Sequence, residues 1–206
     1  MSDSPIIAVD VREACRPKRA GKGQWTKGFV EELLTRGLQV HLYTDADLPS
    51  DWKNAPGAQT KTFRTQGFKW HIEVAQDLRR PEHPPIYISP TSYIVPALVG
   101  KWAETVPVVH DLIAFRGEPH DRKAQLIERF TLGRAVKTAK HVLTISDSTK
   151  ADLLARYPAL DPTKVTSVFA GPMRMNAEKS QPDGRTILCI ATLCPRKNQL
   201  RLIEAY

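Results

Sequence analysis

The chain has 206 residues, of which 41% are hydrophobic, and its formal net charge is +8 at pH 7. This composition excludes disorder as the main state and predicts one large domain or one and a half smaller ones. No run of residues is apolar enough to span a bilayer, and no signal-peptide pattern precedes Asp10. The cysteines Cys15, Cys189 and Cys194 are few and odd in number, so we expect a reducing, cytoplasmic location. The positive charge implies an acidic partner: nucleotide phosphates, a membrane surface or nucleic acid.

Strand and helix signals alternate through the first half of the chain. Residues 6–10 are typical of a buried strand, and the following EACRPKRAGKGQ is polar and basic enough to predict an irregular loop. Apolar residues at Trp25, Phe29 and Leu33 then predict a helix that stops at Gly37. The further elements predicted here are strands at 40–43, 59–63 and 86–89, a weak helix at 68–78, and a turn at 90–96.

Two apolar runs in the middle of the chain each end in a polar residue where a helix should begin. The runs are 106–109 and 142–145, and the polar residues are His110 and Ser146. Residues 121–138 between them have a helical period of apolar side chains, which completes a βαβ unit. Since ligands of open α/β sheets gather beyond the carboxyl ends of the strands, we expect both residues at the functional edge.

The alternation without a repeat predicts an α/β fold, a Rossmann-like, doubly wound and mostly parallel sheet with helices on both faces. With a last strand at 165–169, it should fill a first domain of residues 1–170. Residues 171–185 are rich in Gly, Pro, Asn and Lys and predict an interdomain linker. Residues 186–206 then predict the first strand, at 187–191, and the first helix, from Asn198, of a second domain.

Four motifs carry a family resemblance. In the order of these motifs, the chain resembles the retaining glycosyltransferases of family 4, which have the GT-B fold. The motifs are GKGQWTKGFVEELLTRG, VVHDL, HVLTISDSTKADLL and ILCIATLCPRKNQLRLIEAY. The likeness covers essentially the whole chain, as an amino-terminal, acceptor-side domain and the opening of the donor-side domain. It implies transfer of a sugar from a nucleotide-diphosphate donor to an acceptor such as a glycan or lipid-linked saccharide, as in polysaccharide biosynthesis.

The resemblance also implies retention of the anomeric configuration, no cofactor, and usually no catalytic metal. The family's glutamates that hold the donor ribose and sugar would lie after Tyr206, so we expect this chain alone to be inactive.

Four residues are implied to hold the donor diphosphate. Gly21 and Gly23 precede a predicted helix, where free N–H groups and the positive helix end suit an anion. A flexible loop is the alternative, whereas a dinucleotide fingerprint would need a glycine at Thr26. Arg196 and Lys197 lie at another helix start, where two cations are unfavourable unless an anion binds; a solvated pair is the alternative.

The resemblance makes His110 the catalytic candidate, because the matching family histidine lies beside the donor sugar. The alternative is a core histidine satisfied by a backbone carbonyl. Asp111 and Ser146 are expected near the cleft, and simple capping of the following helical turns would also explain them. A Gly-x-Ser-x-Gly elbow, which a serine hydrolase would need, is absent.

A metal site has the right residue types nearby, but the spacing matches no metal motif, so we expect no metal. The residues concerned are His110, Asp111, Glu118, His120 and Asp121.

Two other functions stay open. A non-catalytic, Rossmann-like module that binds phosphate or a nucleotide would share the glycine and basic motifs. A nucleic-acid binder would explain the charge, but an RNA-stacking motif and a helix-turn-helix are absent and the cations are spread, so we expect no nucleic acid.

A group of cations surrounds the first glycine motif, where an acceptor must enter. We expect it to dock the protein peripherally on anionic lipid at the inner face of a membrane, with solvated loop charge as the alternative. Its members are Arg12, Arg16, Lys18, Arg19, Lys22 and Lys27.

Overall fold

The computed structural model describes residues 5–82, 84–116, 122–171, 181 and 183–206. These divide into two units, Met1–Pro172 and Met173–Tyr206, which are described separately. The first unit contains the sheet, whose strands are β1 (Ile7–Asp10), β2 (Val40–Thr44), β3 (Ala58–Thr62), β4 (Ile86–Ser89), β5 (Thr105–Val109), β6 (Val142–Thr144) and β7 (Val165–Ser167).

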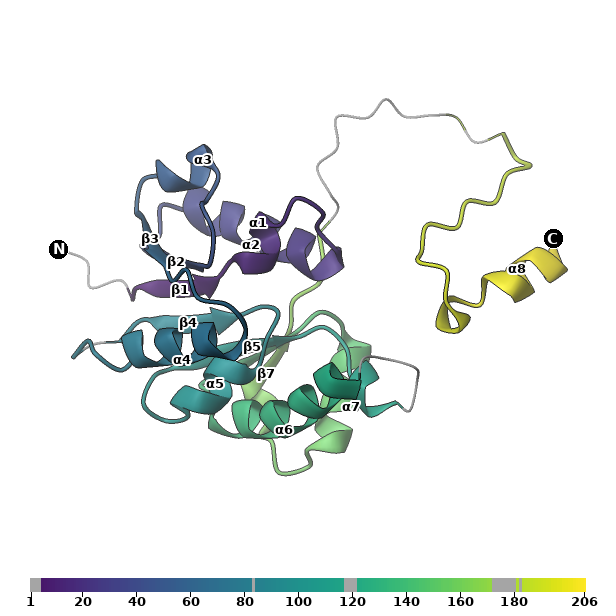
Figure 1. Ribbon diagram of the computed structural model, residues 1–206. Helices are drawn as coiled ribbons and strands as arrows, with labels where there is room; N and C mark the ends of the chain where they lie inside the picture. Colours follow the sequence, from purple (N-terminus) through teal and green to yellow (C-terminus); the bar gives the residue numbers. More distant parts are fainter. Residues whose placement is uncertain (1–4, 83, 117–121, 172–180, 182) are drawn as a thin grey trace. The chain divides into compact units, whose positions relative to one another are not determined.

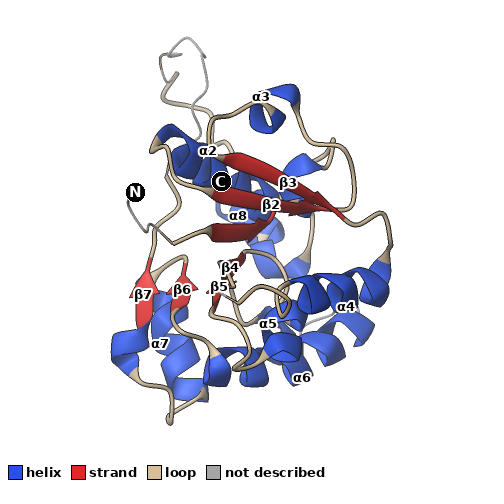
Figure 2. Cartoon of the chain, turned by 90° about the vertical axis from the view of Figure 1, so that its left-hand side faces the viewer, coloured by secondary structure: helices blue, strands red, loops and turns tan. Residues whose placement is uncertain are grey.

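All seven strands run parallel, in the order β3-β2-β1-β4-β5-β6-β7. From β1 the chain moves outward to β3, and from β4 it moves the other way to β7. Since parallel crossovers are right-handed, the two directions place their helices on opposite faces. This arrangement confirms the predicted fold class, a doubly wound α/β sheet (Figures 1 and 2).

Helices cover both faces of the sheet. On one face lie α1 (Arg12–Cys15), α2 (Gly21–Thr35) and α3 (Ser50–Lys53). On the other lie α4 (Gly67–Asp77), α5 (Ile94–Val99), α6 (Arg122–Thr138) and α7 (Asp147–Arg156) (Figure 1). Short 3-10 turns, η1 (Ile113–Phe115) and η2 (Pro162–Lys164), precede α6 and β7.

The core lies on both sides of the sheet, because neighbouring residues of each strand point to opposite faces. Val9 and Leu42 pack with Val30 on the α2 side, whereas Ala8 and Tyr43 pack with helix α4 on the other. A third cluster joins the β5 and β6 strands to α6 and α7. Strands buried on both faces have nearly continuous apolar sequences, which is why the strand predictions agree with the structure to within two residues at each end.

The prediction of an irregular loop between β1 and the first long helix was wrong. It contains α1, and α2 already begins at Gly21, so Gly21 and Gly23 lie in the first turn of that helix. A Cβ on Gly23 would stand 2.5 Å from the Glu13 carbonyl oxygen, which shows how closely α1 and α2 approach. Packing between the two helices therefore outweighs their poor intrinsic helix propensity.

Two further short helices differ from the sequence prediction. Helix α3 lies within a stretch for which no helix was predicted, and α5 begins inside the predicted turn at 90–96. Pro96 is in the first turn of α5, where its missing N–H costs no helical hydrogen bond.

The second unit contains η3 (Pro195–Lys197) and α8 (Gln199–Ala205), and the helix agrees with the one predicted from Asn198. The strand predicted at 187–191 is absent, and Leu188 and Ile190 are largely exposed. A strand needs neighbours for its backbone groups and its apolar side chains, and the described part of this unit offers none. Most of the predicted linker, residues 171–185, lies outside the described residues, so the domain boundaries stay predictions.

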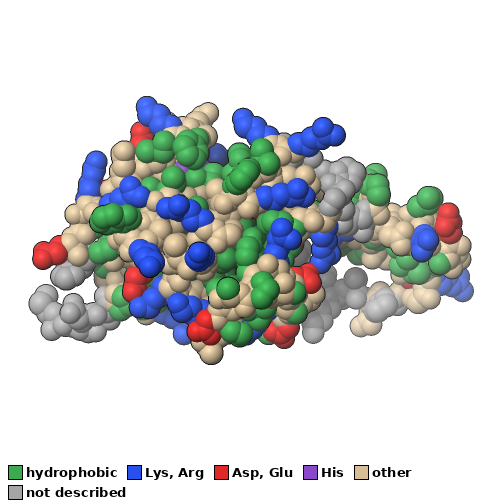
Figure 3. Space-filling view, turned by 90° about the horizontal axis from the view of Figure 1, so that it is seen from below, with side chains coloured by type: hydrophobic (Ala, Val, Ile, Leu, Met, Phe, Trp, Pro, Cys, Tyr) green, Lys and Arg blue, Asp and Glu red, His purple; other side chains and the backbone are tan. Residues whose placement is uncertain are grey.

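The surface of the first unit is basic on the side of α4–α6, where lysine and arginine side chains lie across the face with hydrophobic ones between them (Figure 3). Within the described part of the chain, no helix combines the length and apolar character needed to cross a membrane.

The approach of α1 to α2 gives a first prediction. Gly23→Ala should lower the free energy of unfolding by about 1–3 kcal/mol, because the new methyl group meets backbone atoms of Glu13 that cannot rotate away. The matched control is Gly28→Ala in the same helix, where no described atom lies within 4 Å of the new methyl group. Gly28→Ala should be neutral or stabilise by up to about 1 kcal/mol, by helix propensity. Denaturant unfolding measures both, and equal effects would contradict the close approach.

Candidate functional site

The candidate site lies at the carboxyl edge of the sheet, meaning the side on which the parallel strands end. The strand order reverses between the neighbours β1 and β4, so the chain leaves these two strands toward opposite faces. In open α/β sheets, ligands commonly bind at the carboxyl edge where such a reversal occurs. The loops after β4 and β5 and the first turns of α2 and α7 all follow strands and so begin at this edge.

His110 directly follows β5, at the strand end where it was predicted, and it is buried, with 7% of its surface exposed. Its Nε2 lies 2.9 Å from the carbonyl oxygen of Pro90 in the loop after β4. The Ser89 hydroxyl donates to the Ser92 carbonyl and turns the chain at this point. The loops that follow two neighbouring strands are thus joined through the imidazole ring.

The bond to Pro90 fixes the state of the ring. A carbonyl oxygen only accepts hydrogen bonds, so Nε2 carries the proton and the neutral ring keeps an unprotonated Nδ1. Burial, followed by the positive charge of Lys22, lowers the pKa of His110 to about 4. None of the described residues bonds to Nδ1. At neutral pH the side chain is therefore an uncharged group with one free acceptor nitrogen.

Helix α2 brings the glycine motif to the same place. The edge of the His110 ring meets Trp25 at a centroid distance of 5.5 Å and an interplanar angle of 88°, and Trp25 in turn stacks on Phe29. Lys22 is one turn before Trp25 and so shares its side of the helix. Sequence analysis did not assign Lys22 to the site, although this three-residue spacing is visible in the sequence.

The amino end of α2 has no side-chain cap among the described residues. Gln24 N–H makes the first helical bond, to the Ala20 carbonyl, and no described side chain caps the turn before it. The N–H groups of Gly21, Lys22 and Gly23 precede that bond and carry the positive end of the helix dipole. A phosphate group is the kind of ligand that such a turn binds.

Asp111 and Ser146 both make local bonds. An Asp111 carboxylate oxygen accepts from the Ile113 N–H at 3.2 Å, and Ser146 Oγ caps α7 by accepting from the Thr149 N–H at 3.1 Å. The Thr149 hydroxyl, missed by sequence analysis, donates to the carbonyl oxygen of His110 at 3.3 Å. The first turn of α7 therefore holds the His110 backbone, which gives Ser146 a structural connection to the site.

A buried ion pair closes the end of β1. Asp10 is 1% exposed, and Arg12 Nε and an Arg12 terminal nitrogen lie 3.0 and 2.8 Å from its two carboxylate oxygens. The guanidinium group also lies 3.5 Å from the centroid of the Trp70 ring. Because both charges are satisfied here, Arg12 does not offer a free cation to a ligand.

The basic group predicted around the glycine motif therefore has fewer cations without an acidic partner than the sequence suggests. Besides Arg12, Arg16 pairs with Asp45 at 2.8 Å and Lys27 pairs with Glu31 at 3.2 Å. Half of the predicted membrane-docking cations are consequently engaged by acidic neighbours.

The other predicted diphosphate ligands lie in the second unit. Arg196 and Lys197 belong to η3, one residue before α8, and Lys197 is exposed. Their relation to His110 stays a prediction. For metals, the described residues contain no cluster of three or more His, Cys, Asp or Glu side chains that suits an ion. Glu118, His120 and Asp121, which the metal alternative would need, lie outside the described residues.

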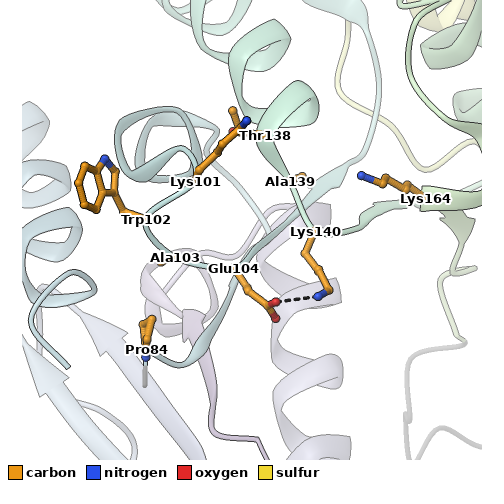
Figure 4. Close-up of a pocket in the computed structure, with 9 residues that line it drawn as sticks. All are labelled: Pro84, Lys101, Trp102, Ala103, Glu104, Thr138, Ala139, Lys140 and Lys164. Atoms are coloured by element: carbon orange, nitrogen blue, oxygen red, sulfur yellow. Dashed lines mark hydrogen bonds and ion pairs between the residues drawn. The ribbon is translucent and has the colours of Figure 1, made fainter. Parts of the chain in front are cut away.

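A separate cavity of about 330 Å³ opens at the opposite edge of the sheet, before the starts of β4–β7. Lys101 and Lys164 extend toward it, and Lys140 pairs with Glu104 at 2.7 Å, while Trp102 points away (Figure 4). Because it lies at the amino ends of the strands, it is not part of the site around His110.

Comparisons with known proteins give only distant likenesses. No protein-family model matches the chain, and no curated protein matches it. Among solved structures, an alpha-glucosyltransferase in complex with UDP and a 13-mer DNA containing an HMU base is 13% identical, with a TM-score of 0.42 over 80% of this chain and 42% of that one. An alpha-glucosyltransferase in complex with UDP is 12% identical, with a TM-score of 0.40 over 87% and 43%.

A third structure, an alpha-glucosyltransferase with UDP and a 13-mer DNA containing a central A:G mismatch, is 13% identical, with a TM-score of 0.38 over 71% and 38%. The chain thus spans about two-fifths of the length of these solved chains. At such TM-scores we base no conclusion on these likenesses.

The buried histidines give a second prediction. Burial lowers the pKa of both His110 and His71 to about 4 from 6.5, so between these values the unfolded chain binds more protons than the folded one. Stability should therefore fall as the pH drops through this window, by about 2 kcal/mol per histidine between pH 7 and pH 5. His110→Asn and His71→Asn should each remove about half of this loss in denaturant unfolding measured across the pH range. An unchanged pH dependence in both variants would show that neither ring is held neutral.

Proposed function

We propose that this chain is the acceptor-side domain, with the start of the donor-side domain, of a retaining GT-B glycosyltransferase of the family 4 type. The proposed reaction moves a sugar from a nucleotide-diphosphate donor to a glycan or a lipid-linked saccharide. The observation that carries the proposal is the contact between Trp25 and His110. It joins two family motifs that are far apart in the sequence, GKGQW and VVHDL, at the carboxyl edge of a doubly wound sheet.

The open turn of α2 suits the donor diphosphate. When the bond between the sugar and the diphosphate breaks, negative charge grows on the departing phosphate oxygens. We propose that the N–H groups of Gly21 and Gly23 and the ammonium group of Lys22 stabilise that charge; in support, they belong to the first turn of α2, and the charge of Lys22 acts on His110. The negative charge of Asp10 does not oppose phosphate binding, because Arg12 pairs with it.

The neutral imidazole of His110 suits the sugar. Positive charge develops on the anomeric carbon as the leaving group departs, and an imidazolium would repel it. A ring with a pKa of about 4 stays uncharged, and its free Nδ1 can accept a hydrogen bond from a sugar hydroxyl. The bonds to Pro90 and from Thr149 hold this nitrogen in place, so orienting the donor needs little further ordering.

We also propose that Arg196 and Lys197 bind the donor diphosphate, and that no cofactor is required. Family-type glutamates for the donor ribose and sugar would have to follow Tyr206.

The alternative is a non-catalytic module that binds phosphate or a nucleotide. One observation favours it: the Nε2 of His110 is satisfied by a backbone carbonyl, as in an ordinary core histidine. This alternative predicts nucleotide binding that is indifferent to His110 and no sugar transfer in any context.

A third prediction separates the two functions. In the chain extended through a complete donor-side domain, His110→Ala should reduce sugar transfer at least about a hundredfold, because it removes Nδ1, a hydrogen-bond acceptor that is held in place before the reaction. His71→Ala is the matched control, since His71 is also 7% exposed, with its pKa lowered to about 4, but lies on α4. Transfer from a panel of nucleotide sugars, with thermal unfolding of each variant, gives the comparison. Equal losses in both variants would assign the effect to folding rather than to chemistry.

The 206-residue chain alone should bind a nucleoside diphosphate weakly, as measured by calorimetry, and should show no transfer. One wall of a cleft cannot align donor and acceptor. Steady, His110-dependent transfer by this chain alone would mean that the active site does not need a second domain.

A further inference from the structure

The outer surface of α6 carries three large apolar side chains that the core does not use. Leu126, Ile127 and Phe130 are 56%, 40% and 73% exposed. Residues three and four apart lie together on a helix, so these side chains are neighbours in one patch near the amino end of α6. We call Leu126, Ile127 and Phe130 the outer α6 patch.

The fold does not require this patch. The opposite side of α6 supplies Leu132, Ala135 and Val136 to the core, where all three are buried against β5, β6 and α7. A helix on the surface of a soluble domain normally has one apolar side and one polar side. On α6 the core-facing side already has its apolar contacts. Further large apolar side chains on the solvent-facing side therefore indicate a surface that is covered by an apolar partner.

The described residues of helix α6 include more basic than acidic side chains. They are Arg122, Lys123, Arg129, Arg134 and Lys137 against Glu128, and two of them, Arg129 and Arg134, donate to the carbonyl oxygens of Ala114 and Ala97. Lys137 is exposed and follows Phe130 by seven residues, which places it on the same side of the helix. Seen from the side of α4–α6, acidic side chains lie toward the rim of the first unit (Figure 3). The medium that covers the patch should therefore be negatively charged as well as apolar.

We propose that the outer α6 patch docks this protein on the surface of a bilayer that contains anionic lipid. A helix with apolar side chains flanked by lysine and arginine lies in the plane of such an interface, with the apolar groups at the acyl boundary and the cations near the lipid phosphates. Long basic side chains can bury their stems and keep their charges at that level. This inference does not rest on the proposed sugar transfer.

The patch also replaces the docking surface expected from the sequence. Three of the cations around the first glycine motif form ion pairs with Asp10, Asp45 and Glu31. Among the described residues of that region, no group of large apolar side chains is as exposed as the outer α6 patch. Exposed apolar side chains and an excess of basic over acidic residues occur together on α6.

Vesicle sedimentation of the whole chain tests the proposal. The wild type should bind vesicles of equimolar phosphatidylglycerol and phosphatidylcholine, and bind phosphatidylcholine alone much more weakly. The double variant Leu126→Gln/Phe130→Gln should lose at least about tenfold in binding, because glutamine keeps the helix propensity and removes the apolar contact. Lys137→Gln should weaken binding by about fivefold at low salt and by less at moderate salt.

Phe169→Gln is the matched control, since Phe169 is 65% exposed but lies after β7. It should bind as the wild type does, and thermal unfolding should show every variant to be folded. Undiminished binding by the double variant, or no binding by the wild type, would overturn the proposal. So would a dimer in sedimentation velocity that the double variant abolishes without any vesicle binding, since a second copy would then cover the patch. None of these outcomes depends on whether sugar transfer is found.

Discussion

The site depends on one constraint: every strand ends at the same edge, so segments far apart in the sequence must meet there. His110, which follows β5, shows the consequence, because its environment is built from the chain after three other strands. The ring bonds to Pro90 after β4 and touches Trp25 of α2, which follows β1. Its carbonyl accepts from Thr149 of α7, which follows β6. A shift in any of these elements would therefore reach the imidazole, so its geometry reports on the packing of the whole edge.

Burial and pairing decide which charges remain available at this edge. Removing His110 from water favours its neutral form, and Lys22 acts in the same direction. Asp10 and Arg12 are also removed from water, but as a pair with two short contacts, so neither projects an unbalanced field. What remains at this edge is the positive end of α2 together with Lys22 and a neutral acceptor nitrogen. This combination is compatible with a phosphate beside an uncharged polyol.

The sequence predicted the long elements and the place of His110 because both follow from local patterns. Buried parallel strands are continuous apolar runs, and the residue that ends such a run lies at the carboxyl edge whatever its neighbours are. The short helices α1 and α3 were missed because tertiary packing rather than propensity forms them. The partners of His110 depend on which strands become neighbours, and no local pattern states that Pro90 will lie beside β5. The strand expected at 187–191 is absent for the complementary reason, since an apolar run without neighbours has nothing to pair with.

The net charge of +8 is distributed unevenly, and the unevenness carries information that the total does not. Near the glycine motif acids lie beside the cations and neutralise Arg12 and Arg16. Helix α6 carries more basic than acidic residues together with exposed leucine, isoleucine and phenylalanine side chains. An exposed phenylalanine lowers solubility and brings no stability to the folded chain, and Leu132 and Val136 already supply the core contacts of this helix. Since 73% of the Phe130 surface is exposed, a polar residue there should cost the fold little, and the proposed contact with a bilayer gives the apolar residue a reason outside folding.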